Sequence, residues 1–296
     1  TSITVKGSGF SANTTGTVTV GVEDRGTFST LAAGTFTSVF TVDSHAYGSN
    51  TVTATDANNV SYAKSEGFIM QPSIKVLPAD GYVGDTITVS GEGFGSTETV
   101  AIHFGAIKTI ATWTTGANGA FSKIFTVVEQ PATITITAIG TTTNASTNTP
   151  FYVTSKIVSI IPNSGTIGTV VEIKGQGYAN GDGLFVYFGT NPDPYSPTPS
   201  AANSSGTFAV NFTTVSQPYG TQTIRVKGNV SGREASGTFS VQAIITMITP
   251  SKGTVGSLVT VEGTGFGNVG TITFGLDTNI RATFTTENGT FSKTFT

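Results

Sequence analysis

The sequence predicts an all-β protein built from tandem Greek-key β-sandwiches, and three observations lead to this fold class. First, residues that suit a pleated surface dominate, because threonine alone fills 56 of the 296 positions, whereas the strong helix formers Met, Lys, Arg, Glu and Leu are few. Second, hydroxyl and apolar side chains alternate at 86–89, 133–136 and 271–274, which is typical of a sheet with one wetted face. Third, the same landmarks recur along the chain.

The clearest landmark is a Gly-x-Gly-aromatic motif that occurs four times. Its copies begin at Gly7, Gly91, Gly175 and Gly263, which are 84, 84 and 88 residues apart. Three other features keep this phase: a proline followed by a glycine turn (78–84, 162–168, 250–256), a Phe-Gly pair (104–105, 188–189, 274–275) and a Gly-x-Phe turn (34–36, 119–121, 206–208, 289–291). Repeats of about 85 residues with many short strands are the sequence pattern of a Greek-key sandwich.

The phase of the landmarks divides the chain into four expected repeats, at 1–72, 73–155, 156–242 and 243–296. The first lacks its opening strand and the fourth lacks its last strands. We therefore expect either that the chain belongs to a longer repetitive polypeptide or that neighbouring chains donate the missing strands. The joins carry no Ser/Gly-rich or Pro-rich spacer, which predicts stiff beads on a string.

The motif itself has a structural interpretation. We expect the first glycine to close a strand or form a bulge, the second to take a positive φ, and the aromatic ring to fill the space between the two sheets. Phe10 should behave in the same way unless the incomplete first repeat exposes it. The residues assigned to this motif are Gly91, Gly93, Phe94, Gly175, Gly177, Tyr178, Gly263, Gly265 and Phe266.

The order of the landmarks resembles the IPT/TIG family of immunoglobulin-like domains. The resemblance is carried by Ile161-Pro162 with the turn to Gly168, then by 171–178 and Phe188-Gly189, and again by 248–275. It implies an immunoglobulin-like sandwich. Tandem domains of this kind occur in prokaryotic surface proteins, adhesins and surface layers, as modules of secreted glycan enzymes, and in eukaryotic receptors and transcription factors.

The composition argues against several functions. Net charge is −3 and the 14 Lys and Arg residues are scattered, so the chain lacks a basic surface for nucleic acid. No uncharged apolar run approaches the roughly 18 residues of a membrane span, and the absence of Cys excludes a disulfide scaffold. The low charge and the abundance of Thr, Ser, Gly and Asn instead indicate an extracellular protein of the cell surface.

No catalytic constellation is evident. The glycine motif lacks the third glycine of a dinucleotide site, since Ala12, Ser96, Asn180 and Asn268 stand there. What recurs from repeat to repeat is Gly, Pro and aromatic residues, and we expect no acidic, basic or nucleophilic residue to recur in phase. The sequence therefore predicts no enzyme, no catalytic residue and no cofactor.

Metal binding gives few candidates. His45 and His103 lie at different phases and neither has a His or Glu four residues on, which argues against zinc. A calcium ion stays open as an alternative, because isolated Asp and Asn oxygens serve as its ligands between domains. The candidates for it are Asp56 with Asn58, Asp80 with Asp85, and Asp182.

Seven Asn-x-Ser/Thr sites make this an expected glycoprotein. They are Asn13, Asn59, Asn144, Asn203, Asn211, Asn229 and Asn288. The proline-rich loop 191–199 departs from the repeat, and it is either a rigid connection or a contact to a neighbouring molecule.

The leading hypothesis is a non-enzymatic structural protein of the cell surface, as a surface layer, a surface filament or an adhesin stalk. Its partners would be further copies of itself, or other surface proteins and glycans. Assembly would use strand edges that carry Thr in place of protective charge. The alternative is a set of carbohydrate-binding or spacer modules of a secreted glycan-active enzyme, with Trp113, Tyr195 and Tyr219 as candidate sugar platforms.

Overall fold

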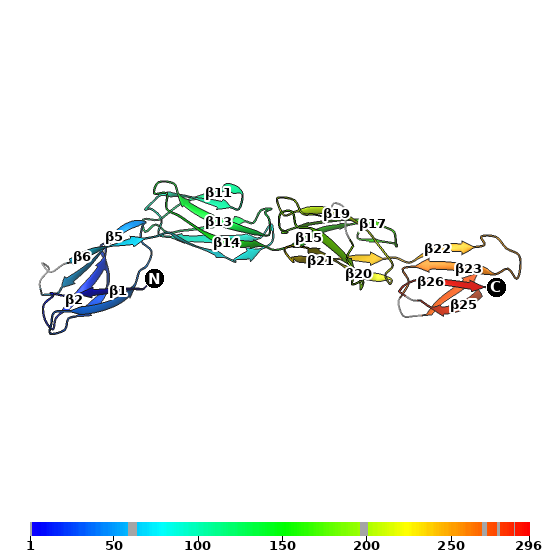
Figure 1. Ribbon diagram of the computed structural model, residues 1–296, viewed down its shortest axis with the longest axis horizontal. Helices are drawn as coiled ribbons and strands as arrows, with labels where there is room; N and C mark the ends of the chain where they lie inside the picture. The colour runs from blue at the N-terminus through cyan, green and yellow to red at the C-terminus, as the bar shows by residue number, and fades with distance from the viewer. Residues whose placement is uncertain (1, 59–63, 196–200, 268–270, 277–278, 287) are drawn as a thin grey trace. The chain divides into compact units, whose positions relative to one another are not determined.

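Every regular element that the structure describes is a β-strand. The computed structural model describes residues 2–58, 64–195, 201–267, 271–276, 279–286 and 288–296, and the fold in these ranges is all-β (Figure 1). Within them there is no helix of the length and apolarity that crossing a membrane requires.

The chain divides into two compact units. The first contains Thr1–Asp80, Thr86–Thr126 and Ile134–Phe151, and the second contains Gly81–Asp85, Val127–Thr133 and Tyr152–Thr296. The boundary runs through the second sequence repeat. The first unit therefore holds repeat 1 with most of repeat 2, and the second holds repeats 3 and 4 with the remaining segments of repeat 2.

Repeat 3 shows the complete plan of one sandwich. One sheet has the order β15-β17-β19 and the other β16-β21-β20-β18. Its strands are β15 (Lys156–Ile161), β16 (Ser164–Gly165), β17 (Val170–Gln176), β18 (Leu184–Phe188), β19 (Phe208–Thr213), β20 (Gly220–Gly228) and β21 (Glu234–Val241). The opening segment pairs first with β17 in one sheet and then, as β16, in parallel with β21 in the other. This strand order is that of an immunoglobulin-like sandwich.

Repeat 2 follows the same plan, with sheets of order β12-β9-β7 and β11-β10-β13-β14-β8. Its strands are β7 (Ser73–Leu77), β8 (Asp80–Gly81), β9 (Thr86–Glu92), β10 (Thr99–Phe104), β11 (Ile107–Thr114), β12 (Phe121–Thr126), β13 (Thr133–Gly140) and β14 (Ser146–Val153). The extra strand β11 extends the second sheet at its edge.

The core forms where period-two alternation turns apolar side chains inward. In repeat 3, Val171 and Ile173 of β17 face Val186 and Phe188 of β18, and all four are fully buried members of one cluster. Burial of one such side chain stabilises the fold by about 1.5–3 kcal/mol relative to exposure. The apolar side chains on the two inner sheet faces therefore supply most of the stability of each sandwich.

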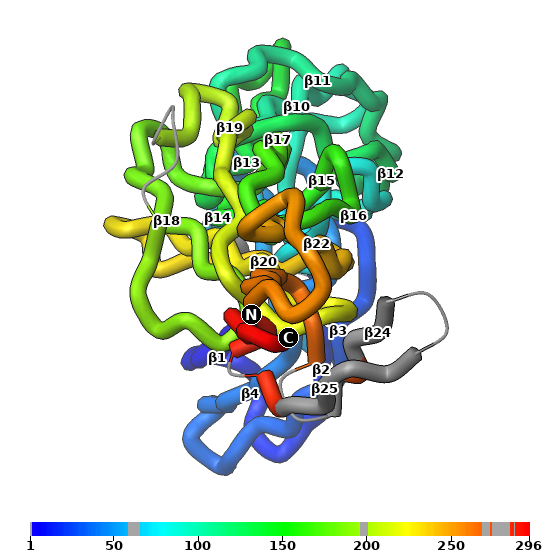
Figure 2. The backbone as a smooth tube through the Cα atoms, turned by 90° about the vertical axis from the view of Figure 1, so that its right-hand side faces the viewer, coloured from blue at the N-terminus to red at the C-terminus, as the bar shows by residue number. Residues whose placement is uncertain are grey.

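Repeats 1 and 4 keep this plan with fewer strands. The sheets of repeat 1 are β1-β4 and β3-β2-β5-β6, and those of repeat 4 are β22-β23-β26 and β24-β25. The strands are β1 (Ser2–Gly7), β2 (Thr15–Val20), β3 (Glu23–Ser29), β4 (Phe36–Thr41), β5 (Gly48–Asp56), β6 (Lys64–Met70), β22 (Ile244–Thr249), β23 (Val259–Thr264), β24 (Thr271–Leu276), β25 (Asn279–Thr285) and β26 (Phe291–Phe295). β1 pairs along its whole length with β4 (Figure 2), and among the described residues its other edge has no strand.

The motif glycines adopt the expected backbone. Gly93, Gly177 and Gly265 have φ values of +73°, +80° and +74°. The aromatic residues differ between repeats: Phe94 and Tyr178 are fully buried, whereas Phe10 and Phe266 are only partly buried. For Phe266 the expectation of a well-buried ring therefore holds only in part, because repeat 4 has a smaller second sheet in the described residues.

Candidate functional site

The predicted glycosylation sites lie on the surface wherever the structure describes them. Asn13, Asn144, Asn203, Asn211, Asn229 and Asn288 are all exposed, and Asn59 lies outside the described residues. Of these, the side chain of Asn203 is already engaged, because its Oδ1 accepts hydrogen bonds from the backbone N–H groups of Ser205 and Thr207 at 3.0 Å each.

The three candidate sugar platforms differ in how open they are. Trp113 on β11 is 43% exposed, but the ammonium of Lys123 lies 4.6 Å from the centre of its ring. Tyr219 is 65% exposed, whereas Tyr195 packs at 5.3 Å against Phe212 of the core. Tyr195 is therefore a packing residue.

A buried carboxylate that the sequence patterns did not predict is present in each of the first three repeats. Glu98 lies four residues after Phe94, and Asp182 lies four residues after Tyr178, so an acidic residue does recur in phase. Both side chains are buried, as is that of Asp56 in repeat 1. The expectation that no acidic residue recurs was wrong, because the recurring position lies four residues beyond the motif aromatic and not within the motif.

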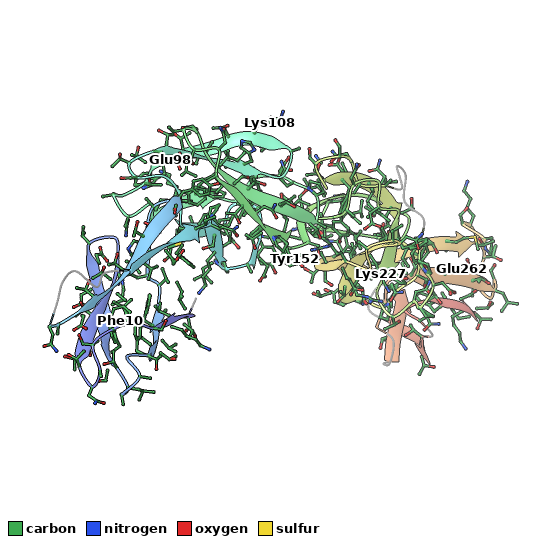
Figure 3. All side chains as sticks on the ribbon, turned by 60° about the vertical axis from the view of Figure 1, so that its left-hand side comes forward. Phe10, Glu98, Lys108, Tyr152, Lys227 and Glu262 are labelled. Atoms are coloured by element: carbon green, nitrogen blue, oxygen red, sulfur yellow. The ribbon has the colours of Figure 1, made fainter. Side chains whose placement is uncertain are left out.

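These carboxylates tie the loop after the motif to the hairpin between the last two strands. Glu98 (Figure 3) accepts hydrogen bonds from the N–H groups of Gly95, of Thr142 at 3.2 Å and of Thr143 at 3.0 Å. Burial alone would raise the pKa of Glu98, but the hydrogen bonds from Thr143, Gly95 and Thr142 outweigh it and hold the pKa below its ordinary value.

The other two carboxylates make the same connection. Asp182 accepts hydrogen bonds from the N–H groups of Val230 at 2.9 Å and Ser231 at 3.3 Å. In repeat 1 the carboxylate comes from the hairpin side, since Asp56 ends β5 and accepts hydrogen bonds from Asn58 N–H and Ser11 N–H, both at 2.9 Å. These hydrogen bonds, that from Asn58 foremost, lower the pKa of Asp56.

The calcium candidates are not brought together into one cluster. Asp56 and Asp182 accept the hydrogen bonds just described, an arrangement that satisfies buried carboxylates without an ion. Asp85 accepts a hydrogen bond from the N–H of Tyr82 at 2.9 Å, and Asp80 is exposed.

One acidic cluster with a histidine lies on repeat 1. The ligand atoms of Glu23, Asp43 and His45 all lie within 4.8 Å of one another. The guanidinium of Arg25 lies among them and donates hydrogen bonds to both carboxylates. Because Arg25 already supplies the positive charge that a cation would bring, the cluster is an ion-pair network.

The glycine motif does more than pack its own repeat, because it also forms the junction with the preceding one. The carbonyl of the aromatic residue accepts a hydrogen bond from a backbone N–H of the preceding repeat in three places. These bonds run from Tyr47 to Phe94 at 2.7 Å, from Ala132 to Tyr178 at 2.9 Å and from Tyr219 to Phe266 at 2.8 Å. Each of these bonds lies within one compact unit.

The second glycine of the motif leaves space for the chain that joins two repeats. A Cβ added at Gly93, Gly177 or Gly265 would collide with the backbone oxygen of Gln71, Thr154 or Gln242. The joining residue thus passes directly over the motif. The sequence held a signal for this junction, since Pro131 and Pro218 precede two of the N–H donors, Ala132 and Tyr219, at the same phase.

The junction between repeats 2 and 3 has one further contact. Arg233 donates hydrogen bonds to the carbonyl oxygens of Val153 at 2.7 Å and Ala132 at 2.9 Å. Burial lowers the pKa of this guanidinium relative to its ordinary value. Arg233 therefore connects the β20–β21 hairpin with two segments of the preceding repeat.

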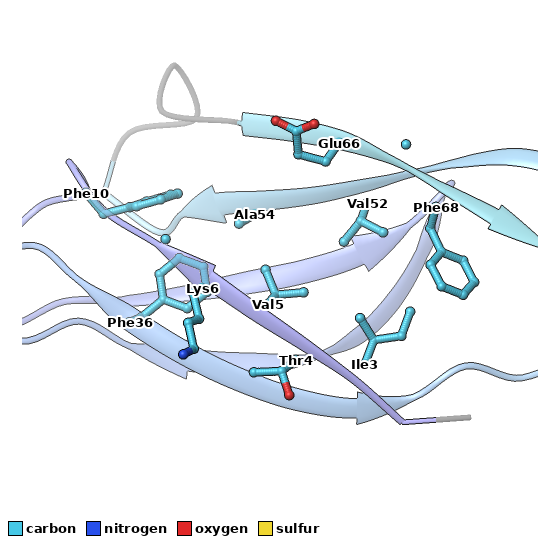
Figure 4. Close-up of a pocket in the computed structure, with 12 residues that line it drawn as sticks. Ile3, Thr4, Val5, Lys6, Phe10, Phe36, Val52, Ala54, Glu66 and Phe68 are labelled. Atoms are coloured by element: carbon cyan, nitrogen blue, oxygen red, sulfur yellow. The ribbon is translucent and has the colours of Figure 1, made fainter.

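An apolar groove lies in repeat 1. It has a volume of about 290 Å³ and lies between β1 and the neighbouring strands β5 and β6 (Figure 4). Its apolar lining is Ile3, Val5, Phe10, Phe36, Val52, Ala54 and Phe68, and Lys6 and Glu66 add the charged groups.

The groove marks the place that the opening strand occupies in the other sandwiches. Counted from the motif, Val5 corresponds to Ile173, and counted from the end of the last strand, Phe68 corresponds to Phe239. Ile173 and Phe239 are fully buried, whereas Val5 and Phe68 are only partly buried. In repeat 3 the aliphatic side chains of β15, Ile157 and Ile160, pack against the core at this place.

Comparison with known proteins gives no family. No protein-family model matches the chain, and no curated protein matches it. Among solved structures it is similar to a tetra-tandem repeat in the extending region of a large adhesion protein, at 15% identity and a TM-score of 0.31, over 98% of this chain and 86% of that one.

Two further similarities are of the same order. One is to the D1–D4 ectodomain fragment of ICAM-5, at 12% identity and a TM-score of 0.28, over 99% of this chain and 93% of that one. The other is to the protein SGBP-B of a mixed-linkage glucan utilization locus of Bacteroides ovatus, at 14% identity and a TM-score of 0.25, over 83% and 66%. At these values none of the three identifies a function.

Proposed function

We propose that this protein is a non-enzymatic structural protein of the cell exterior, built from immunoglobulin-like repeats of the IPT/TIG type. It would serve in a surface layer, a surface filament or an adhesin stalk, with further copies of itself as partners and with glycans on its exposed sequons. Catalysis and a resident cofactor form no part of the proposal.

One observation carries the proposal: what the chain preserves from repeat to repeat is its junction. The hydrogen bond from the preceding repeat to the motif aromatic is formed three times, by different residues but in the same geometry. A glycine with positive φ makes room for the joining chain in the same three places. Residues that recur for chain connection, together with carboxylates that are engaged in backbone hydrogen bonds, support a mechanical role.

Surface labelling tests the proposal. Antibodies against the repeats should decorate intact producing cells, and mild external protease should remove the label. Negative-stain microscopy of the material so located should show a regular layer or fibres. Label that is accessible only after permeabilisation would contradict the proposal. Monodisperse protein that binds polysaccharide, with binding lost in Trp113→Ala or Tyr219→Ala, would favour the carbohydrate-binding alternative.

A further inference from the structure

We propose that β11, the edge strand of repeat 2, pairs antiparallel with β11 of a second copy of this chain and so joins two sheets into one. The inference deepens the proposed structural role and rests on it for the choice of partner. The interface lies in a complete repeat, because every residue of 73–155 is described and both sheets have their full set of strands.

β11 offers an open edge with a regular backbone. It is the last strand of the sheet β11-β10-β13-β14-β8 (Figure 1), and no described strand is bonded to its outer edge. Its pairing with β10 is regular from Ala111 to Thr114 and shifts register in the segment before, which contains Thr109 with a φ of +60°. Because alternate residues of a strand direct their N–H and C=O groups outward, the stretch 111–114 can accept a further strand.

The corresponding edge is protected in repeats 1 and 3. In repeat 1 the edge strand β3 begins with three charged residues, 23–25, and charge is a usual defence against strand addition. In repeat 3 the edge of β18 is already occupied, because the backbone of Tyr195 exchanges hydrogen bonds with that of Val186 at 2.7 and 2.9 Å. β11 has neither protection, since its single charge, Lys108, precedes the regular stretch and the strand carries no glycosylation sequon.

Side-chain chemistry selects the register of the pair. Opposed residues on antiparallel strands point to the same face, which leaves two registers centred on 111–114: Thr112 opposite Thr112 of the second copy, or Trp113 opposite Trp113. The ammonium of Lys123 lies 4.6 Å from the centre of the Trp113 ring. The second register would therefore bring two ammonium groups together, and like charges across a strand pair destabilise it. The first register avoids this repulsion.

In the first register the two strands complement each other in size. Trp113 is paired with the buried Val100 of β10 and so lies on the inner face. Opposite it on the second copy is the small side chain of Ala111, and the same contact repeats across the two-fold axis. The ring of Trp113 is 43% exposed in the single chain, and the added strand would cover part of it.

The contact adds backbone hydrogen bonds and breaks none. Both edges are unpaired beforehand, so the joined sheet gains a ladder while every existing strand pair stays in place. The contact is isologous and closes as a two-fold pair. Because two short strands bury little surface, it belongs to the weak class of specific interfaces and forms where copies are crowded, as in the surface assembly proposed above.

Disulfide formation in single-cysteine variants tests the inference, since the natural chain has no Cys. In the proposed register the Cα atoms of the two Thr112 residues lie about 4.5–5.5 Å apart, a separation that a disulfide spans. Thr114→Cys is the matched control, because Thr114 is also an exposed threonine on the same face of β11. The two Thr114 residues would lie four positions apart along the strands, about 14 Å.

The Thr112→Cys protein should form disulfide-linked dimers at least about tenfold faster than the Thr114→Cys protein at the same concentration. Equal rates, or faster linkage in Thr114→Cys, would overturn the proposal. In a mixture of the two variants, a predominant disulfide between positions 112 and 114 would overturn it as well, because that bond belongs to the register with Trp113 on Trp113.

A second measurement uses the natural chain, whose only tryptophan is Trp113. Its fluorescence should shift to the blue as the protein concentration rises to about 1 mM, because pairing covers the ring. Thr112→Lys should abolish the shift by placing two ammonium groups opposite each other, whereas Thr114→Lys, which faces Ile110, should keep it. The absence of a shift in the natural chain, or a shift of equal size in Thr112→Lys, would overturn the proposal. Neither failure affects the surface-labelling result, so the two proposals fail separately.

Discussion

Repeats 3 and 1 share five strands in the same order, but repeat 3 has β15 and β16 in addition, whereas repeat 1 has β3 in addition. β15 covers the side of repeat 3, while the corresponding side of repeat 1 is the open groove. As a result Tyr178 is fully buried and Phe10 is not, although both follow the same glycine motif. The comparison shows that the motif places the aromatic ring and that its burial depends on the strands around it, since Phe266 is partly buried beside the small second sheet of repeat 4 although β22 is present.

The largest expected effect comes from removing the aromatic ring in the closed repeat. Tyr178→Ala should reduce the free energy of unfolding of repeat 3 by about 3–5 kcal/mol, because it leaves a cavity in a fully packed core. Phe10→Ala should cost clearly less, since water already reaches that ring. Hydrogen exchange of peptides from each repeat, followed through denaturant, measures both. Equal losses would show that repeat 1 is as closed as repeat 3.

The next effect separates backbone strain from crowding at the junction. Gly9 and Gly177 have similar φ values, +82° and +80°, but only Gly177 has backbone of the joining chain within 4 Å of a built Cβ. Alanine at either position should cost about 1–3 kcal/mol for the positive φ. Gly177→Ala should cost more than Gly9→Ala because Thr154 has to move. A larger loss at Gly9 in thermal unfolding would contradict this account of the junction.

The buried carboxylate gives a pH-dependent effect. The folded pKa of Glu98 lies below its ordinary value of 4.5, so its stabilising contribution is complete above that pH. It is lost as the pH falls through the lower, folded pKa, because the unfolded chain then binds the proton first. The hydrogen-exchange protection factors of the 140–145 hairpin, corrected for the intrinsic pH dependence of exchange, should therefore fall below about pH 4.5.

Glu98→Gln is the matched control for that pH dependence. The substitution should lower the free energy of unfolding by about 1–3 kcal/mol at neutral pH, because hydrogen bonds are lost. It should also flatten the acid dependence of hydrogen-exchange protection in the 140–145 hairpin. An acid dependence that is unchanged in the variant would assign it to other groups.

The smallest expected effect concerns the junction contact of Arg233. Arg233→Ala removes two hydrogen bonds to Val153 and Ala132, and the loss should be about 1–2 kcal/mol, confined to the ends of β14 and β21. Arg225→Ala is the control, because Arg225 pairs with Glu234 at the surface, where such pairs contribute little. A loss in Arg225→Ala that equals that in Arg233→Ala would contradict the assigned role.

The fold was predictable because it rests on local signals. Alternation placed the strands, and the recurring glycines identified turns and the positive-φ positions at Gly93, Gly177 and Gly265. These signals belong to short stretches of sequence. Comparing several copies in one chain separates them from chance.

The site was less predictable because it depends on contacts between distant segments. The carboxylate of Glu98 accepts a hydrogen bond from Thr143, which lies 45 residues later in the sequence. The hydrogen bond from Tyr47 N–H to the carbonyl of Phe94 joins backbone atoms only. Backbone contacts leave little trace in residue identity. The groove of repeat 1 was foreseeable as an open side, but its lining by Phe68 and Val52 became evident only when β6 and β5 were placed beside β1.

Native-state hydrogen exchange along β1 and β17 tests most directly whether the opening strand distinguishes the two repeats. In a dilute, monomeric sample the outward amides of β1 should exchange at least about tenfold faster than those of β17, because none of the described strands is bonded to that edge. Equal protection of the two strands in the monomer would contradict the account.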